Sequence, residues 1–340
     1  MEIIRLKLFE NQKRIIIFLS LVIITVILVN YFGNSPLQYK ETENGNILKI
    51  QGYELKKEIS YKLVNAENYS VILSNKCEVT GDLHDRHKLR WVKIWLLKNI
   101  YIFGSNINET LPYYLNIFLH SILLFLTLII LNKTFKLEIL HIIFYLLFIC
   151  FIFQQQLSEY SFSIFELFFA SMCIYASKIK NLILLSLLSF LAILNRESGI
   201  ILLLSWFIFN NDYKKIIISL IIISISYLLI NYRHVNCMIN PAFFVPFEYQ
   251  KNQVNFSDIK DIGIISTIKL FTINFIIPFG IIFYNYIVKK IRNKSFLIIT
   301  LIYLVTFLVA TPLLHISTKM IILPLILTSF HLHKFNKIKS

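Results

Sequence analysis

The stretch NLILLSLLSFLAILNRESG, residues 181–199, decides the fold of this 340-residue chain. Residues 181–194 carry no charge, and the charged pair Arg196 and Glu197 follows almost at once. A helix of that length rises about 21 Å, which is less than the roughly 30 Å hydrocarbon core of a bilayer. Charged side chains at such a depth are costly unless they are paired or used. We therefore interpret the stretch as a short membrane helix whose end carries functional candidates.

Basic residues on both sides predict how this helix and the next one are oriented in the membrane. Two lysines in 178–180 precede the apolar hairpin, and two more at 214–215 follow it. Because short cytoplasmic loops are enriched in Lys and Arg, both flanks are predicted to be cytoplasmic and the Arg196 turn extracytoplasmic. Gly199 is expected to supply the left-handed backbone of a tight turn. The alternative is that Arg196 and Glu197 only cap the two helices.

Composition points to the same class of protein. Hydrophobic residues make up 56% of the chain and charged residues 16%, with 8 Gly, 7 Pro and 4 Cys. A soluble domain carries about 25% charged residues, and disordered chains are polar and poor in aromatic residues. The low Gly, Pro and Cys counts exclude collagen-like chains and disulfide scaffolds. The remaining class is a polytopic membrane protein.

The apolar segments predict an all-α fold, a transmembrane helix bundle forming one membrane domain over 1–340. Their continuous apolar character differs from the alternation of barrel strands. Two longer extracytoplasmic loops are expected, at about 33–111 and 233–261. The roughly ten predicted spans are 15–32, 112–131, 139–154, 161–177, 181–194, 199–210, 216–232, 270–288, 295–312 and 320–333.

The distribution of basic residues places both termini in the cytoplasm. The predicted inner segments hold 17 of the 34 Lys and Arg residues, whereas the short outer turns hold only Arg196 and Lys319. The first span is expected to be a retained signal anchor, because its apolar run is too long for a cleaved signal peptide. Most of the formal net charge of +15 thus lies in the inner segments, so no nucleic-acid partner is needed to explain it.

The first long loop contains the densest group of ionisable residues, GDLHDRH at 81–87. Asp82 and Asp85 are candidates for a catalytic general base. Arg86 can bind a phosphate through two hydrogen bonds, and His84 lies between these groups. No neighbouring His or Cys pair favours a metal site, so no cofactor is expected, with a divalent metal as the less favoured alternative. A solvated loop without function is the other reading.

The residues that follow predict a helix on the membrane surface. Trp91 and Trp95 are four positions apart, and basic residues are interspersed over 87–98. This pattern is typical of an interfacial helix on the outer leaflet, and equally of an amphipathic helix packed on the bundle. In either case the helix would hold the Asp82 segment near the Arg196 turn.

Other outer segments contribute further candidates for substrate binding. Glu159 and Glu166 are seven positions apart and share one face of the predicted span 161–177. Glu166 lies about one turn inside that apolar run, where a carboxylate is expected to face a cavity or a cationic partner, or else to be a packing residue. Arg233, His315 and Lys319 lie in two further outer segments.

Together these features resemble the GT-C superfamily of polytopic membrane glycosyltransferases. The long acidic first loop, the Asn195-Arg196-Glu197 turn, and Lys319 followed by Pro324 carry the resemblance. It implies a polyprenyl-phosphate-linked sugar as donor and a glycan or lipid as acceptor. An acid of the first outer loop would act as base, here Asp82 or Asp85, which are three positions apart. Basic residues of the outer turns, here Arg86, Arg196 and Lys319, would hold the phosphate.

The resulting hypothesis is an extracytoplasmic sugar transfer in a bacterial or archaeal plasma membrane, with membrane lipids as further partners. The absence of a Gly-rich phosphate loop on the inner side fits a lipid-linked donor better than a nucleotide sugar. A polymerase of surface polysaccharide, of the O-antigen type, is the closest alternative. A transporter or flippase of lipid-linked glycans is less favoured because the ionisable residues gather at one face and no repeat is visible. A non-enzymatic assembly subunit is a further class.

Overall fold

The computed structural model describes mainly the helical part of the chain. The residues described are 19–20, 23, 38–41, 47–50, 92, 96, 99, 103, 107, 111–139, 141–147, 162–210, 212–232, 268, 272, 276–288, 293–310 and 322–339.

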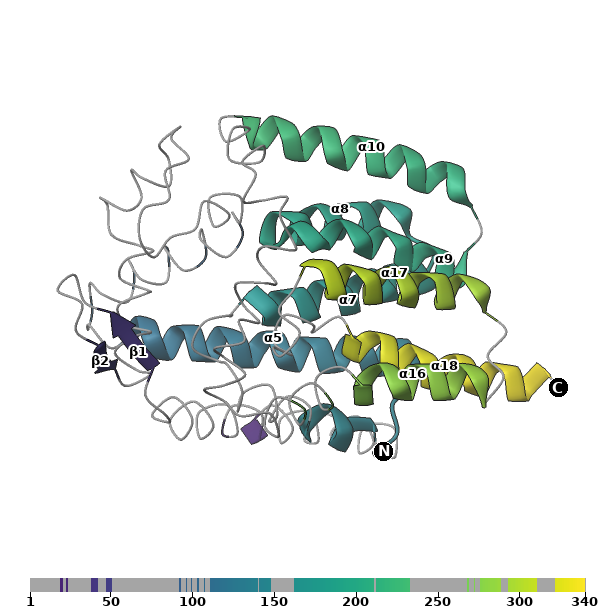
Figure 1. Cartoon of the computed structure of the whole chain (residues 1–340). Helices are drawn as coiled ribbons and strands as arrows, with labels where there is room; N and C mark the ends of the chain where they lie inside the picture. Colours follow the sequence, from purple (N-terminus) through teal and green to yellow (C-terminus); the bar gives the residue numbers. More distant parts are fainter. Residues whose placement is uncertain are drawn as a thin grey trace, which may run out of the picture.

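Helices dominate this part of the chain and lie side by side in a bundle (Figure 1). A short helical stretch at 141–147 follows the helix that ends at Phe135. Their bounds are Leu111–Phe135 (α5), Phe162–Lys178 (α7), Leu182–Asn195 (α8), Glu197–Ser205 (η2, a 3-10 helix), Trp206–Phe209 (α9), Tyr213–Ile230 (α10), Ile277–Ile287 (α16), Lys294–Ala310 (α17) and Ile322–Lys339 (α18).

A two-stranded ribbon within the first long loop is an element that the prediction of an all-α chain did not include. The strands Gln38–Glu41 (β1) and Ile47–Ile50 (β2) pair antiparallel, with Gln38 opposite Ile50 and Glu41 opposite Ile47. The sequence Asn44-Gly45 between them is a common hairpin turn signal. The ribbon is short, so the helical bundle remains the framework of the molecule.

The predicted apolar segments are helical wherever the structure describes them, and the rest of spans such as 15–32 and 139–154 lies outside the described residues. Two of the described helices are long and apolar enough to cross a membrane, within α5 at Phe118–Phe135 and within α10 at Tyr213–Ile230. Half of the first window is buried inside the protein, but only 17% of the second. The segment 199–210 was predicted as one regular span, and instead it is a nine-residue 3-10 helix followed by one α-helical turn.

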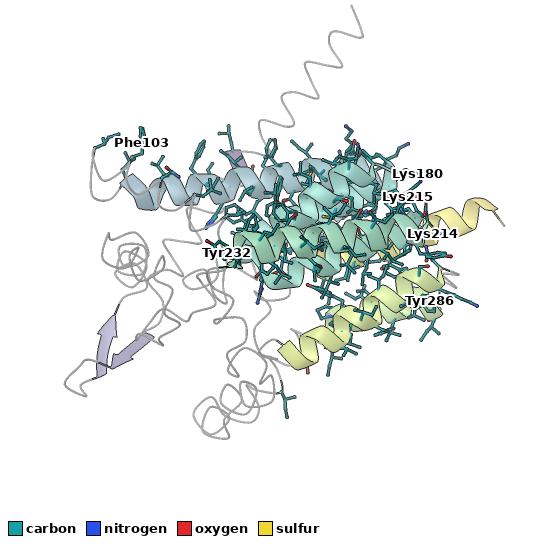
Figure 2. All side chains as sticks on the ribbon, turned by 90° about the horizontal axis from the view of Figure 1, so that it is seen from above. Phe103, Lys180, Lys214, Lys215, Tyr232 and Tyr286 are labelled. Carbon is teal, nitrogen blue, oxygen red and sulfur yellow. The ribbon has the colours of Figure 1, made fainter. Side chains whose placement is uncertain are left out.

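Successive helices alternate in direction, so the loops between them gather at two ends of the bundle. α7, η2 with α9, and α16 finish at one end, where α8, α10 and α17 begin (right in Figure 1). Figure 2 shows Lys180, Lys214 and Lys215 together at this end, and Tyr232 at the opposite one. We call the end that carries these lysines the basic end. The lysines that define it are Lys133, Lys136, Lys178, Lys180, Lys214, Lys215 and Lys294.

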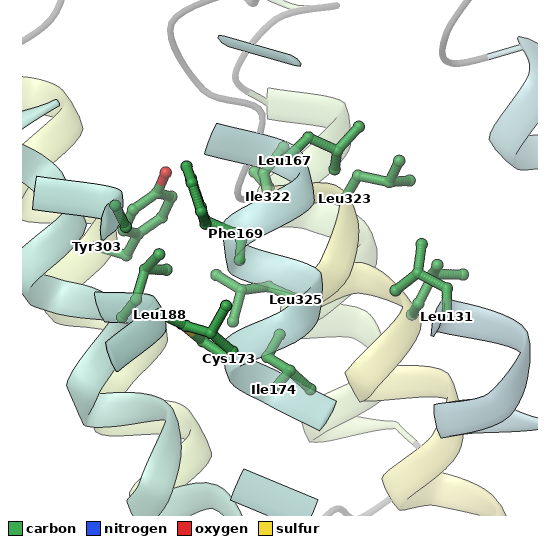
Figure 3. Close-up of a cluster of buried hydrophobic side chains, with 14 of the residues drawn as sticks. Leu131, Leu167, Phe169, Cys173, Ile174, Leu188, Tyr303, Ile322, Leu323 and Leu325 are labelled. Carbon is green, nitrogen blue, oxygen red and sulfur yellow. The ribbon is translucent and has the colours of Figure 1, made fainter. Parts of the chain in front are cut away.

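The core lies between α5, α7, α8 and α18 (Figure 3). Leu131 of α5, Leu167 and Ile174 of α7, and Leu323 of α18 are almost completely buried in it. Small residues such as Ala170 allow the helix axes to approach each other, as is typical of membrane helices. α7 is therefore the central helix, and any group on its inner face is isolated from solvent.

Hydrogen bonds that involve hydroxyl groups also link neighbouring helices. Ser177 Oγ lies 2.8 Å from Ser205 Oγ, and Ser186 Oγ donates to Ser219 Oγ at 3.0 Å. Asn285 Nδ2 donates to Ser329 Oγ at 2.9 Å. Hydrogen bonds between small polar side chains are a common device between helices in lipid.

Candidate functional site

A buried ion pair joins the α8–η2 turn to the central helix. Arg196 Nη1 donates to Glu166 Oε2 of α7 at 2.9 Å. The side chain of Glu166 is 3% exposed and that of Arg196 is 15% exposed. Both residues lie away from the basic end, since Glu166 is in the second turn of α7 and Arg196 follows the last residue of α8. We call Glu166 and Arg196 the charge pair.

The backbone at Arg196 explains how the chain presents this side chain. Arg196 alone connects α8 to η2, in an extended conformation with φ −161° and ψ 139°. Its N–H donates to the carbonyl of Ala192 at 2.8 Å, and its own carbonyl accepts from the N–H of Gly199 at 2.8 Å. These two bonds fix the residue from both sides, so its side chain is held at the apex of the hairpin.

Gly199 has a different role from the one predicted for it. It lies inside η2 and does not adopt the left-handed conformation, because the reversal is made by the extended backbone of Arg196. A Cβ at this position would lie 2.3 Å from the carbonyl carbon of Ala192 and 2.5 Å from the backbone nitrogen of Ile193. Glycine is thus required so that the two arms of the hairpin can touch backbone to backbone.

The expectation that Glu166 faces a cationic partner is confirmed by its contact with Arg196. The alternative, in which Arg196 only caps helices, does not describe its side chain, which makes no capping hydrogen bond to η2. Removing one member of a buried pair leaves an uncompensated charge, which costs about 3–5 kcal/mol. A replacement of both members by apolar groups is often neutral, so the pair is weak evidence for a purely stabilising role.

Apart from this pair and the adjacent Glu197, the charged residues of the described helices lie toward the basic end. Close to the charge pair along the chain, Leu167 and Phe169 of α7 and Ile193 of α8 are all buried. A guanidinium carries five N–H donors in a rigid plane suited to carboxylate and phosphate oxygens. The arrangement can therefore bind an anion beside Glu166, provided that the anion reaches the exposed part of Arg196.

Of the other predicted site residues, the structure describes only the backbone position of Glu197. Glu197 is the first residue of η2. The remaining candidates lie outside the described residues, and they are Asp82, His84, Asp85, Arg86, Glu159, Arg233, His315 and Lys319.

The predicted interfacial helix is described at three positions. Val92, Leu96 and Asn99 are helical, and Val92 and Leu96 are half-buried against the core. Their spacing of four places both apolar side chains on one face. The amphipathic pattern after the Asp82 segment therefore packs at least part of its apolar face on the bundle.

Two features of the site could not be found by pattern alone. Asn195, beside Arg196, is completely buried, although the sequence suggests only a polar turn residue. The pairing of Glu166 with Arg196 joins residues thirty positions apart. The depth of both charges inside apolar runs was the signal for such a partner. Among the described residues, no group of three His, Cys, Asp or Glu side chains is arranged to hold a metal ion.

Comparison with known proteins adds no assignment: no family model, no curated protein and no solved structure matches the chain.

Proposed function

We propose that the chain is a multi-pass membrane protein with about ten spans and both termini in the cytoplasm. The nearly all-apolar surface of α10 supports this topology, because Ile218, Ile222 and Leu229 are more than half exposed. So large an apolar face is unfavourable in water and favourable in lipid. The grouping of lysines at one end of the bundle agrees with a cytoplasmic location of that end.

We further propose that it is a glycosyltransferase acting at the extracytoplasmic face. The observation that carries this proposal is the charge pair: an arginine at the apex of a short helical hairpin, only 15% exposed and bound to a buried carboxylate. Such a poorly solvated guanidinium strengthens electrostatic stabilisation of a developing phosphate charge. The sequence resemblance to GT-C enzymes supplies the donor class, a polyprenyl-phosphate-linked sugar.

In the proposed reaction the hydroxyl oxygen of the acceptor attacks the anomeric carbon of the sugar. The bond between that carbon and the phosphate oxygen breaks, and the polyprenyl phosphate leaves with the electron pair. Asp82 or Asp85 accepts the hydroxyl proton, while Arg86, Arg196 and Lys319 neutralise the leaving phosphate. Glu166 acts as a positioning residue, because it fixes the plane of the Arg196 guanidinium.

The test compares lipid-linked oligosaccharides in cells that lack the gene and in cells complemented with variants. Arg196→Lys keeps the charge but loses the planar fork, so transfer should fall at least tenfold while the protein stays in the membrane. Asp82→Asn and Asp85→Asn test the base separately. Lys214→Gln, an exposed change at the basic end, is the matched control and should retain full activity. Full activity of Arg196→Lys would reject the phosphate-binding role.

The same profiles separate the related functions. A transferase-deficient cell makes complete glycan chains that lack one sugar, whereas a polymerase-deficient cell accumulates single repeat units. Loss of a flippase leaves complete lipid-linked glycan on the cytoplasmic side. Only the first pattern supports the proposed reaction.

A further inference from the structure

A second feature lies at the opposite end of the molecule from the charge pair. An open pocket of about 430 Å³ is present at the basic end, beside the loop between α9 and α10. Its lining residues are Lys180, Trp206, Phe209, Asn210, Asp212 and Lys215. None of them belongs to the proposed transferase site.

The pocket has a positive local field. Lys180 follows α7 in a left-handed turn with φ 58°, and its ammonium group has no partner among the described residues. Lys215 Nζ lies 2.9 Å from Asp212 Oδ2, with exposed fractions of 62% and 40%, so both groups are accessible. The pocket also adjoins the first turn of the 18-residue helix α10, where the helix dipole is positive.

Trp206 adds a buried donor to this wall. The residue is 5% exposed, and its Nε1–H has no hydrogen-bond partner in the described part of the chain. A buried N–H without an acceptor is unfavourable. Because Nε1 has almost no accessible surface, a ligand oxygen would reach it only after a shift of the indole ring. Asn210 is already engaged, since its Nδ2 donates to the carbonyl of Ser177 at 2.8 Å. The donors already exposed to a ligand are therefore the ammonium groups of Lys180 and Lys215.

We propose that this pocket binds a phosphate group, carried by a lipid headgroup or free in solution. Lys180 and Lys215 bind the phosphate oxygens, and the Trp206 indole donates to one of them. Asp212 holds Lys215 over the pocket through their ion pair. Phe209 and the indole ring provide an apolar wall for the glycerol part of a headgroup. This site goes beyond sugar transfer and does not depend on it.

The experiment uses the full-length protein in detergent and counts bound ligand by native mass spectrometry, with thermal unfolding as a second readout. The probes are dihexanoyl phosphatidylglycerol, dihexanoyl glycerol, which has the same chains without phosphate, and inorganic phosphate. Lys180→Gln should weaken phosphatidylglycerol binding about tenfold, the value of one charged hydrogen bond. Lys214→Gln, the same charge change one residue from Lys215 but outside the pocket lining, should change binding less than about twofold.

Trp206→Phe distinguishes a binding role from a structural one. It should weaken phosphate binding, and thermal unfolding of the unliganded protein measures separately what the smaller ring costs in packing. Should this variant not fold, the Lys180 and Lys214 pair decides alone. Binding of phosphatidylglycerol alone identifies a headgroup site, and binding of inorganic phosphate identifies the free ion; both support the pocket. Equal binding of dihexanoyl glycerol, equal losses in Lys180→Gln and Lys214→Gln, or binding of neither phosphate probe would overturn it.

Discussion

The charged side chains at the two ends of the bundle differ in their exposure. At the basic end Lys214 and Lys215 are exposed, and the ion pair of Lys215 with Asp212 lies in the open. At the other end Glu166 is buried and held by Arg196 across two helices. Exposed charges interact weakly through water, so such a pair adds little to the stability of the fold. Each charge of a buried pair needs an opposite charge held in a fixed position beside it. A binding site needs the same fixed geometry.

The largest expected effect comes from breaking the charge pair. Glu166→Gln leaves Arg196 without its anion and should lower the free energy of unfolding by about 3–5 kcal/mol. Unfolding of the purified protein by denaturing detergent in mixed micelles measures this change.

A matched double variant separates stability from function. Glu166→Leu combined with Arg196→Met removes both charges, so stability should return to within about 1 kcal/mol of the wild type while transferase activity stays lost. Recovery of activity together with stability would contradict a functional role for Arg196.

The second effect concerns the contact between the arms of the hairpin. Gly199→Ala puts a methyl group onto the backbone at Ala192 and should cost about 1–3 kcal/mol, with a larger loss if the arms cannot separate. Gly280→Ala in α16 is the control, because a Cβ there meets nothing within 4 Å. It should stabilise the helix by about 0.5–1 kcal/mol. Equal effects of the two variants would show that the backbone contact does not matter.

A smaller effect is expected at the basic end, where Lys178 is partly buried. Its Nζ donates to the carbonyl of Thr134 in the last turn of α5 and lies 3.3 Å from Nε2 of His331 in α18. Lys178→Met keeps the apolar stem but removes this cap, and should cost about 1 kcal/mol. Lys214→Met should be neutral in the same thermal unfolding assay. A neutral Lys178→Met would mean that this contact with Thr134 and His331 does not stabilise the bundle.

The smallest effect is a pH dependence at the exposed pair. The hydrogen bond from the Lys215 side chain lowers the pKa of Asp212 below its ordinary value of 3.8. A depressed pKa in the folded state means that the stabilisation is present above that value and is lost as pH falls through the folded pKa. Asp212→Asn keeps a capping side chain without charge. Its small difference from wild type in unfolding midpoint should therefore be seen at pH 6 and shrink below about pH 3.8.

The helices were predictable because apolar length alone determines them. The fourteen uncharged residues 181–194 became α8 with a shift of one residue, and the basic residues beside them gather at one end. The depth of Glu166 inside an apolar run predicts a cavity, a cationic partner or a packing role, and the structure shows the cationic partner. These properties follow from the cost of charge in an apolar environment, which is local to each segment.

The local geometry of the hairpin was not predictable from the same pattern. Gly199 was assigned to a turn because glycine commonly serves there, whereas here it gives space to a neighbouring backbone. An apolar segment has the same hydropathy whether it forms an α-helix or a 3-10 helix. The hydropathy pattern therefore could not predict that 197–205 forms a 3-10 helix. Which acid pairs with Arg196 depends on packing between α7 and α8, and the sequence offered both Glu166 and the adjacent Glu197.

The winding of η2 sets where the arginine lies along its neighbour. A 3-10 helix rises about 2.0 Å per residue against about 1.5 Å in an α-helix, so the nine residues of η2 span about 18 Å in place of about 13.5 Å. An α-helical arm would draw the apex about 4.5 Å toward the basic end. That distance is three residues of α7, which would put the guanidinium level with buried Phe169 in place of Glu166. The greater length of η2 as a 3-10 helix thus keeps Arg196 level with Glu166, the one acidic residue of α7. No additional residue is needed for this alignment.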